Sequence, residues 1–472
     1  MKILVLNPPY GDDFCRSARW AAKSRGRVQR HPDWLLTAVA VLERAGHDVV
    51  FSDAAALNLG LDQVKDVIRQ ARPELAVVHT TTPSIDSDIA HARLARELSG
   101  CRTVLVGPHV TALPDDTFAR AAGAVDFIAR GEYDYILQDL ADGKPPAEIP
   151  GLSWLSAGAP VNNPYGAPVD VNTLPFPAWR HIKPEWYRDA GKRFPFLTLI
   201  SGRGCLGRCT FCRDTTESMA GRHMRARSAA AIVDEMEYDL KLFPQLREIM
   251  FETDTLTASA VQMRALCEEI HRRGLKATWS CNTRVDLDLA LLPLMREAGC
   301  RMLMVGFEFG TQAALDAVKK GITLEQSKKF AAEAARLGFT IHGCFMIGAP
   351  GETRESATAT VEFAKSLPLD TVQFSGICVY PGTELYDWAK EKGYLVPKEW
   401  KDWVSPEREQ VTLLSYPQLS KAEIDYFIDR GLKEFYLRPS QLLRMLFASP
   451  ADLVRKLYGA RSFFAYLLGR RR

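Results

Sequence analysis

Long hydrophobic runs are missing from this sequence of 472 residues, and so is a clear excess of charge of either sign. No apolar run reaches the length of about 20 residues that a membrane-spanning helix needs. The formal net charge of +3 is too small to favour nucleic acid as a partner. The N-terminus is broken by Pro8 and Pro9 too early for a signal peptide. We therefore expect a cytoplasmic globular protein with room for two or three domains.

Cysteine is sparse outside one short segment, which holds three of the ten cysteines. The others are scattered, and this distribution suits a reducing compartment with buried or inert thiols. Cys205, Cys209 and Cys212 instead form a C-x3-C-x2-C pattern directly after the apolar run 196–200. Thiolates are soft ligands that suit iron–sulfur clusters and zinc. This segment is therefore the first candidate for a metal site.

No further cysteine lies near this triad, and its absence bears on the metal. A closed structural zinc site requires four protein ligands, so a distant residue such as His223 would have to complete it. Three thiolates instead leave one iron of a four-iron cluster open to a substrate. Glycines at positions 202, 204 and 207 allow the backbone to turn closely around such a cluster. The pattern favours an iron–sulfur cluster, with zinc as the alternative.

The first 142 residues alternate short apolar runs with helical periodicity. The runs lie at 3–6, 49–51, 75–78, 104–106 and 125–129. This alternation predicts an α/β domain with a doubly wound parallel sheet and helices on both faces. Ligands of such sheets bind at the carboxyl ends of the strands. The candidate binding residues expected there are Tyr10, Thr80, Thr81, Thr82, Ser84, Gly107, His109, Gly131 and Glu132.

A proline-rich stretch separates this region from a second alternation of strands and helices. We expect residues 143–195 to be a linker with a small hairpin near 152–161. Residues 196–392 then repeat the strand and helix pattern six times, which predicts a partial (β/α)6 barrel. Chemistry in barrels sits at the carboxyl ends of the strands. The remaining residues, 393–472, predict a helical C-terminal region.

The cysteine pattern, with the aromatic Phe211 before its last thiol, resembles the signature of the radical S-adenosylmethionine (SAM) superfamily. The resemblance implies a [4Fe–4S] cluster whose open iron chelates SAM. One electron, from a donor such as flavodoxin or ferredoxin, would then cleave SAM to a 5′-deoxyadenosyl radical. Later segments resemble the SAM-binding positions of the family and imply that Asp254, Arg284, Glu308 and Gly348 bind SAM together with Phe211. Phe309 departs from the serine that is usual at its position.

The loops of residues 1–142 resemble the cobalamin-binding domain that precedes many radical SAM domains. The resemblance implies that the candidate binding residues named above at the strand ends, from Tyr10 to Glu132, bind cobalamin, although an empty domain is the alternative. The D-x-H-x-x-G signature, whose histidine replaces the lower ligand of cobalt, is absent, and residues 11–15 stand in the expected place. We therefore expect base-off cobalamin without a histidine ligand, its lower face over the loop 80–84. His31 and His109 are alternative ligands.

The domain order resembles cobalamin-dependent radical SAM enzymes, and several details resemble the member associated with hopanoid biosynthesis. These details lie at 31–35, 79–84, 125–130 and 414–420, whereas 213–217 departs from that enzyme. The resemblance implies ring contraction or rearrangement of a small or lipid-linked substrate. The alternatives are a C-methyltransferase, in which cobalamin donates a methyl group to a substrate radical, and an anaerobic oxidative cyclase. A non-catalytic cobalamin-binding protein is the alternative outside enzymes.

The last residues of the chain combine apolar and basic side chains. Residues 453, 454, 457, 458, 464 and 468 can share one apolar face of a helix, with arginines and a lysine beside it. Such a helix can lie on an anionic membrane surface or simply pack on the barrel. The first interpretation predicts peripheral contact with the inner membrane surface.

Overall fold

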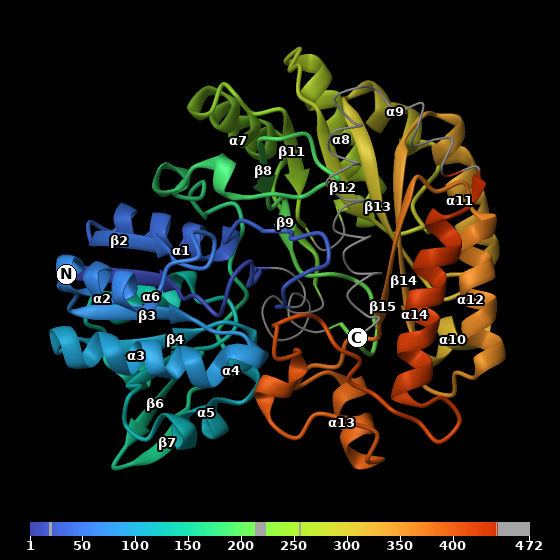
Figure 1. The fold of residues 1–472 in the computed structure, drawn as a ribbon. Coiled ribbons are helices and arrows are strands. Elements are labelled where there is room, and N and C mark those ends of the chain that lie inside the picture. The colour runs from blue at the N-terminus through green and yellow to red at the C-terminus, as the bar shows by residue number, and fades with distance from the viewer. Residues whose placement is uncertain (18–20, 213–222, 254–255, 440, 442–472) are drawn as a thin grey trace. The chain divides into compact units, whose positions relative to one another are not determined.

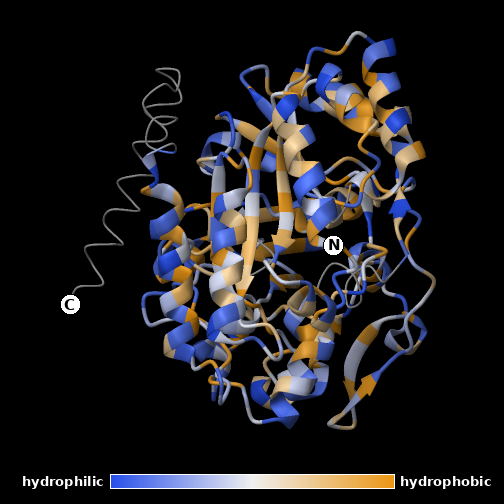
Figure 2. Ribbon diagram, turned by 90° about the vertical axis from the view of Figure 1, so that its right-hand side faces the viewer, coloured by the Kyte–Doolittle hydropathy of each residue, from blue (hydrophilic) through white to orange (hydrophobic). Residues whose placement is uncertain are grey.

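The computed structural model describes residues 1–17, 21–212, 223–253, 256–439 and 441, and its chain forms two compact units (Figure 1). Unit 1 includes Met1–Arg188 and Pro397–Gln410. Unit 2 includes Asp189–Cys212, Met224–Val396 and the described residues after 410. Figure 2 shows hydrophobic residues along the strands, while hydrophilic and hydrophobic residues alternate around the helices. Both units are α/β, which confirms the predicted fold class.

The sheet of unit 1 has the strand order β2-β1-β3-β4-β5-β6-β7, and its first five strands along the chain are parallel. These five strands are β1 (Lys2–Asn7), β2 (Asp48–Asp53), β3 (Leu75–His79), β4 (Arg102–Val106) and β5 (Phe127–Ala129). The antiparallel hairpin β6 (Leu152–Ser156) and β7 (Ala159–Asn162) extends the sheet beyond β5. The order reverses at β1 and β3, so the carboxyl ends of these strands form the crevice where ligands of such sheets bind.

Alternate side chains of β1 enter different cores, as the period of a buried strand requires. Ile3 and Val5 pack in a core with α1 (Asp33–Arg44) and α6 (Asp134–Ala141). Leu4 and Leu6 pack in another core with α2 (Leu61–Ala71) and α3 (Ile85–Ser99). Two shorter helices, α4 (Pro108–Ala112) and α5 (Pro114–Ala121), connect β4 to β5. The helices therefore cover both faces of the sheet, as predicted.

The proline-rich stretch largely joins unit 1, since that unit runs through Arg188. Tyr187 shows why: its hydroxyl donates a hydrogen bond of 2.8 Å to Asp53 at the end of β2. Asn7 Nδ2 at the end of β1 donates to the other oxygen of Asp53 at 2.8 Å. Burial raises the pKa of Asp53 despite these hydrogen bonds. This buried contact holds residues near 187 against the ends of β1 and β2.

The sheet of unit 2 has the order β15-β14-β13-β12-β11-β8, and all of its neighbouring strands are parallel. Its strands are β8 (Phe196–Leu199), β11 (Glu248–Phe251), β12 (Trp279–Thr283), β13 (Cys300–Glu308), β14 (Thr340–Ile347) and β15 (Thr371–Gly376). The strands therefore follow one another in space in chain order, which is the topology of a partial (β/α)6 barrel.

Helices connect these strands and continue the unit after the last one. They are α7 (Ala229–Leu242), α8 (Ala260–Arg272), α9 (Leu291–Glu297), α10 (Gln312–Ala317), α11 (Leu324–Arg336), α12 (Arg354–Ser366), α13 (Glu384–Glu391) and α14 (Lys421–Tyr436). Helix α14 packs on β15 and α12 at the edge of the barrel. A Cβ atom on Gly431 of α14 would lie 2.9 Å from the ring of Phe374, so glycine permits this close approach.

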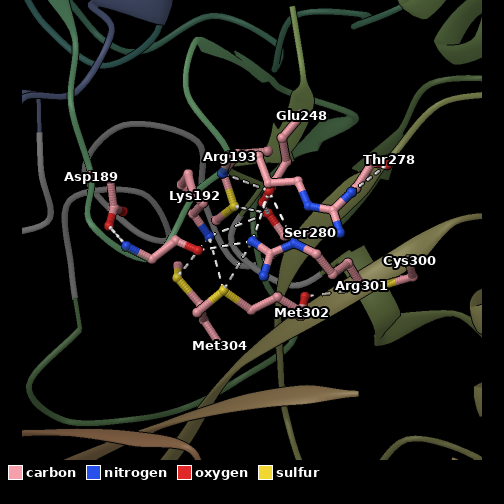
Figure 3. Close-up of polar contacts among 12 residues, drawn as sticks. Asp189, Lys192, Arg193, Glu248, Thr278, Ser280, Cys300, Arg301, Met302 and Met304 are labelled. Atoms are coloured by element: carbon pink, nitrogen blue, oxygen red, sulfur yellow. Dashed lines mark hydrogen bonds and ion pairs between the residues drawn. The ribbon is translucent and has the colours of Figure 1, made fainter. Parts of the chain in front are cut away.

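A buried polar network joins the amino ends of three barrel strands (Figure 3). Glu248 accepts hydrogen bonds from Ser280 Oγ at 2.6 Å and from Arg301 Nη2 at 2.7 Å. Lys192 Nζ lies 3.2 Å from Ser280 Oγ and is fully buried. Buried charges are tolerated when they are paired and hydrogen-bonded in this way. The network braces β11, β12 and β13 at the end opposite to the cysteine loop.

The predicted membrane-contacting helix falls in residues 442–472, which lie outside the described residues. Among the helices that the structure describes, none has both the length and the apolar character needed to cross a bilayer.

Candidate functional site

The three cysteines lie in a loop that a short antiparallel ladder closes at its base. Strand β9 (Gly202–Arg203) pairs with β10 (Arg225–Ala226). A Cβ atom on Gly202 would lie 2.6 Å from the carbonyl oxygen of Arg225, so this pairing requires glycine. Thr210 N donates to the carbonyl of Val318 at 3.0 Å, and the Thr210 carbonyl accepts from Leu385 N at 3.0 Å. The thiol loop is therefore anchored to the segments that follow β13 and β15.

Gly207 places two of the thiols on one side of the loop. Its N–H donates to Cys205 Sγ at 3.3 Å. A Cβ atom on Gly207 would lie 3.3 Å from Cys205 Sγ and 3.9 Å from Cys209 Sγ. Cys212 follows half-buried, and its N–H donates to the Cys209 carbonyl. The backbone thus turns tightly beside the sulfur atoms, as a metal-binding loop requires.

Arg284, which follows β12, faces this thiol loop. Its Nη1 would lie 3.6 Å from a Cβ atom on Gly207. Asp286 accepts hydrogen bonds from Arg284 Nε at 2.9 Å and Nη2 at 2.8 Å, and the Lys320 carbonyl accepts from Nη2 at 2.9 Å. Burial disfavours the charged form of Arg284. Asp286 and the thiols of Cys209 and Cys205 favour the charged form more strongly, so the pKa of Arg284 is raised. A fixed guanidinium therefore stands beside the loop.

A buried ion pair between Lys320 and Glu308 lies next to Arg284. Lys320 Nζ lies 2.6 Å from Glu308 Oε1, and both side chains are largely buried. Burial disfavours the Lys320 charge, but Glu308 and then Cys209 outweigh it and raise the pKa. Gly306 makes room for the pair, because a Cβ atom there would lie 2.4 Å from Glu308 Oε1. Glu308 itself has a φ of 65°, a left-handed conformation that turns the end of β13.

Gly348 lies in a rigid turn after β14. Its N–H and that of Ala349 donate to Oε2 of Glu352, and its carbonyl accepts from the Tyr416 hydroxyl at 2.7 Å. Burial raises the pKa of Glu352 to about 7, although the two N–H groups favour the ionised form. The N–H of Gly348 is thus already used, and the turn can present only its shape and its remaining backbone to a ligand.

Four of the five predicted SAM-binding residues lie among the described residues. Arg284 and Glu308 meet through Lys320 beside the thiol loop, Phe211 lies in that loop and is half-buried, and Gly348 lies after a neighbouring strand. Asp254 falls outside the described residues. Sequence reasoning assigned no role to Lys320 and did not identify Glu352 or Tyr416. Lys320 was visible only as part of a Lys-Lys-Gly segment, which carries no chemistry by itself.

The thiol loop fits a [4Fe–4S] cluster through its donor set and the cations around it. Three soft thiolates are the ligands that such clusters take, and Arg284 and Lys320 balance their negative charge. Among the described residues, no three histidine, cysteine or acidic side chains form a ready-made metal site. The fit therefore rests on the chemistry of the loop and not on a preformed ligand geometry.

In unit 1, the loops after β3 and β4 lie against each other. Gly107 has a φ of 118°, and a Cβ atom on it would lie 2.6 Å from the Thr80 carbonyl oxygen. His109 Nδ1 lies 3.3 Å from Thr82 Oγ1. The predicted residues Thr80, Thr81, Thr82, Ser84, Gly107 and His109 are therefore neighbours. Gly131 adjoins them through its N–H, which donates to Thr111 Oγ1 at 3.1 Å, whereas Glu132 accepts from Val169 N at 3.0 Å.

Arg16 covers this loop and was not identified from the sequence. Its guanidinium is fully buried and forms an ion pair of 2.9 Å with Asp88. It also donates to the His79 carbonyl at 2.7 Å and to Ser84 Oγ at 3.1 Å. Asp88 in turn accepts from Ser84 Oγ at 2.7 Å. A buried cation therefore packs against the loop 80–84, over which the lower face of cobalamin was expected.

The histidines of unit 1 differ in what surrounds them. His31 is buried between Tyr187 and Trp179, with ring centroids 4.0 and 5.7 Å away. Burial, with Arg16 nearby, lowers the pKa of His79 to about 3, so its ring is neutral near pH 7. Among the described residues, Nδ1 of His79 is buried without a hydrogen-bond partner. This ring, which sequence reasoning did not weigh as a ligand, places a neutral nitrogen atom at the end of β3.

Two protein families match this chain, one in each unit. Residues 199–364 match the family model of the radical SAM superfamily, and residues 26–141 match the B12 binding domain. An uncharacterized methyltransferase of Pyrococcus horikoshii is 27% identical over 468 residues, which cover 97% of each chain. The anaerobic magnesium-protoporphyrin IX monomethyl ester cyclase of Rubrivivax gelatinosus is 26% identical, covering 86% of this chain and 73% of its own.

A solved structure shows the same fold over nearly the whole chain. It is the radical SAM methyltransferase TsrM of Kitasatospora setae with cobalamin and a [4Fe–4S] cluster bound. The TM-score is 0.71 at 15% identity, and the match covers 99% of this chain and all of that one. The order of a doubly wound unit before a partial barrel is therefore shared with this structure.

Proposed function

Because the chain is a radical SAM enzyme with a B12-binding domain, we propose that it transfers a methyl group to a carbon of a small or lipid-linked substrate. The observation that carries the proposal is the relative described as a methyltransferase, whose similarity covers 97% of both chains. When bound, the iron–sulfur cluster supplies the electron that cleaves SAM, and cobalamin supplies the methyl carrier. A flavodoxin or ferredoxin would be the source of electrons.

The residues of unit 2 would bind and orient SAM. The Arg284 guanidinium, held by Asp286 and the Lys320 carbonyl, suits the SAM carboxylate. Lys320 holds Oε1 of Glu308, while Oε2 makes no hydrogen bond among the described residues and can accept from the SAM amino group. Both contacts would be made by side chains that are already fixed, so little conformational entropy is lost on binding.

Two other reactions compete with methyl transfer. A cyclase reaction has support from the relative in Rubrivivax gelatinosus, whose similarity covers less of the chain. Ring contraction of the hopanoid kind, to which the sequence resemblance points, is not favoured by these relatives, whose names are methyltransferase and cyclase.

Product analysis separates methyl transfer from the other reactions even without the substrate. The reconstituted protein is incubated with cobalamin, a reductant and SAM that carries a labelled methyl group. We expect S-adenosylhomocysteine to form and the label to appear on the corrinoid, because a methyltransferase must first move the methyl group to its carrier. Formation of 5′-deoxyadenosine and methionine alone would reject methyl transfer and favour cyclisation or rearrangement.

We also propose that cobalamin binds base-off without a nitrogen ligand from the protein. The buried Arg16 guanidinium over the loop supports this, since a cation cannot ligate cobalt. Electron paramagnetic resonance of the Co(II) form should therefore show no nitrogen superhyperfine splitting. A splitting that disappears in His79→Ala would identify the neutral His79 ring as the ligand and contradict the proposal.

A further inference from the structure

We propose that residues Pro397–Gln410, here called the strap, form one wall of the cobalamin site, with the Trp400 indole as its contact. The strap follows the barrel in the chain but belongs to unit 1. It lies far outside residues 26–141, which match the B12 binding domain. The inference rests on the proposed binding of cobalamin by unit 1.

The first half of the strap packs on the loops at the carboxyl ends of β3 and β4. Its short helix η7 (Trp400–Trp403) packs on η1 (Thr82–Ser84). The Trp400 ring meets the His109 ring edge to face, with centroids 5.1 Å apart. Trp400 Nε1 donates to Asp116 Oδ2 at 3.2 Å. The ring centroids of Trp400 and Trp403 are 4.9 Å apart. Trp400 thus reaches the predicted cobalamin residues although it lies almost 300 residues after them.

The second half of the strap contacts the loop after β1. Val404 shares a small buried core with Phe14, Ala21 and Ala22. The Arg408 guanidinium lies 4.1 Å from the centroid of the Tyr10 ring. The Arg408 carbonyl accepts from Lys23 N at 2.7 Å. The strap is therefore ordered along its length and touches predicted cobalamin residues, His109 and Tyr10, near both ends.

The side chains beside the strap suit the corrin ring of cobalamin. A corrin is a broad and mostly apolar ring, and indole side chains offer it a rigid flat surface at little entropic cost. Trp400 is only half-buried, so part of its ring remains available. His79, with its buried and unpartnered Nδ1, lies at the same edge. Trp400 also packs against a hydrophobic core that includes Ile85, Val110 and Phe118, and this contact fixes the indole beside these loops.

The test uses the full chain reconstituted with iron and sulfide, and hydroxocobalamin as the probe. We expect Trp400→Ala to raise the dissociation constant for hydroxocobalamin at least tenfold, with iron content unchanged. Trp400→Phe, which keeps a ring and loses the indole N–H, should fall between. Trp154→Ala is the matched control, because Trp154 pairs with Phe127 at the amino end of β5 and lies away from the site.

Hydrogen exchange of the unsubstituted protein provides a second readout that does not depend on the folding of a variant. Cobalamin should slow the exchange of amides in both the strap and the loop 80–84. An unchanged dissociation constant in Trp400→Ala, or protection of the loop without the strap, would overturn the inference. Failure of the unsubstituted protein to bind hydroxocobalamin would instead reject cobalamin binding itself, and the inference with it.

Discussion

Replacement of Cys205, Cys209 and Cys212 by alanine is expected to abolish the formation of 5′-deoxyadenosine from SAM. The thiols are the soft donors of the loop that Arg284 and Lys320 flank, and a [4Fe–4S] cluster bound through three of them keeps one iron open for SAM. Each single replacement should also remove activity, because two thiolates do not hold a cluster with one open position. The measurements are iron and sulfide content and 5′-deoxyadenosine after reduction with dithionite.

Cys344→Ala serves as the control, since Cys344 is also partly exposed and belongs to the same unit but lies on β14, outside the thiol loop. It should retain both the cluster and SAM cleavage. Cleavage of SAM by the triple alanine variant would show that the electron comes from elsewhere and that the loop serves another purpose, such as binding zinc.

Replacement of Arg284 by alanine is expected to raise the dissociation constant for SAM tenfold or more. Charge-assisted hydrogen bonds contribute roughly 1.5–3 kcal/mol, and about 1.4 kcal/mol corresponds to a factor of ten. Arg284→Lys should recover part of the affinity, because it keeps the charge and loses the two-pronged geometry. Equilibrium dialysis with the reconstituted protein gives the affinity separately from turnover.

Arg336 offers a matched control in the same unit. Among the residues that the structure describes, its exposed side chain pairs only with Glu333, one turn earlier on α11, and such surface pairs contribute little. Arg336→Ala should leave SAM affinity unchanged. If Arg284→Ala also leaves it unchanged, the guanidinium is not part of the SAM site, and its ion pair with Asp286 is only structural.

Lys320 shows the limit of reading roles from a sequence. Its neighbours along the chain suggest nothing more than a turn after α10. Its function as the partner of Glu308 depends on a bulge between β13 and β14 and on Gly306, which leaves space for both side chains. No local pattern encodes that meeting, since neither the bulge nor the space for the two side chains is visible in residue spacing.

The contacts of Arg16 and of the strap are also not encoded in any local sequence pattern. They join residues that lie still farther apart in the chain. The loop after β1 reads as an irregular segment without the expected histidine motif, yet Arg16 reaches Asp88 on α3 and packs against the loop after β3. The strap reads as part of a C-terminal region, yet Trp400 packs on His109. Both contacts depend on how distant segments pack in the folded chain.

By itself, the sequence determined the order of two α/β units, the strands of both sheets and the thiol loop, because strand periodicity and metal-ligand spacing are local properties of the chain. Only the tertiary structure decided which charges meet beside the thiols, which cation covers the loop after β3, and which unit receives residues 397–410. These are pairings between residues far apart in sequence, and their energies depend on burial and geometry that appear only when the segments have packed.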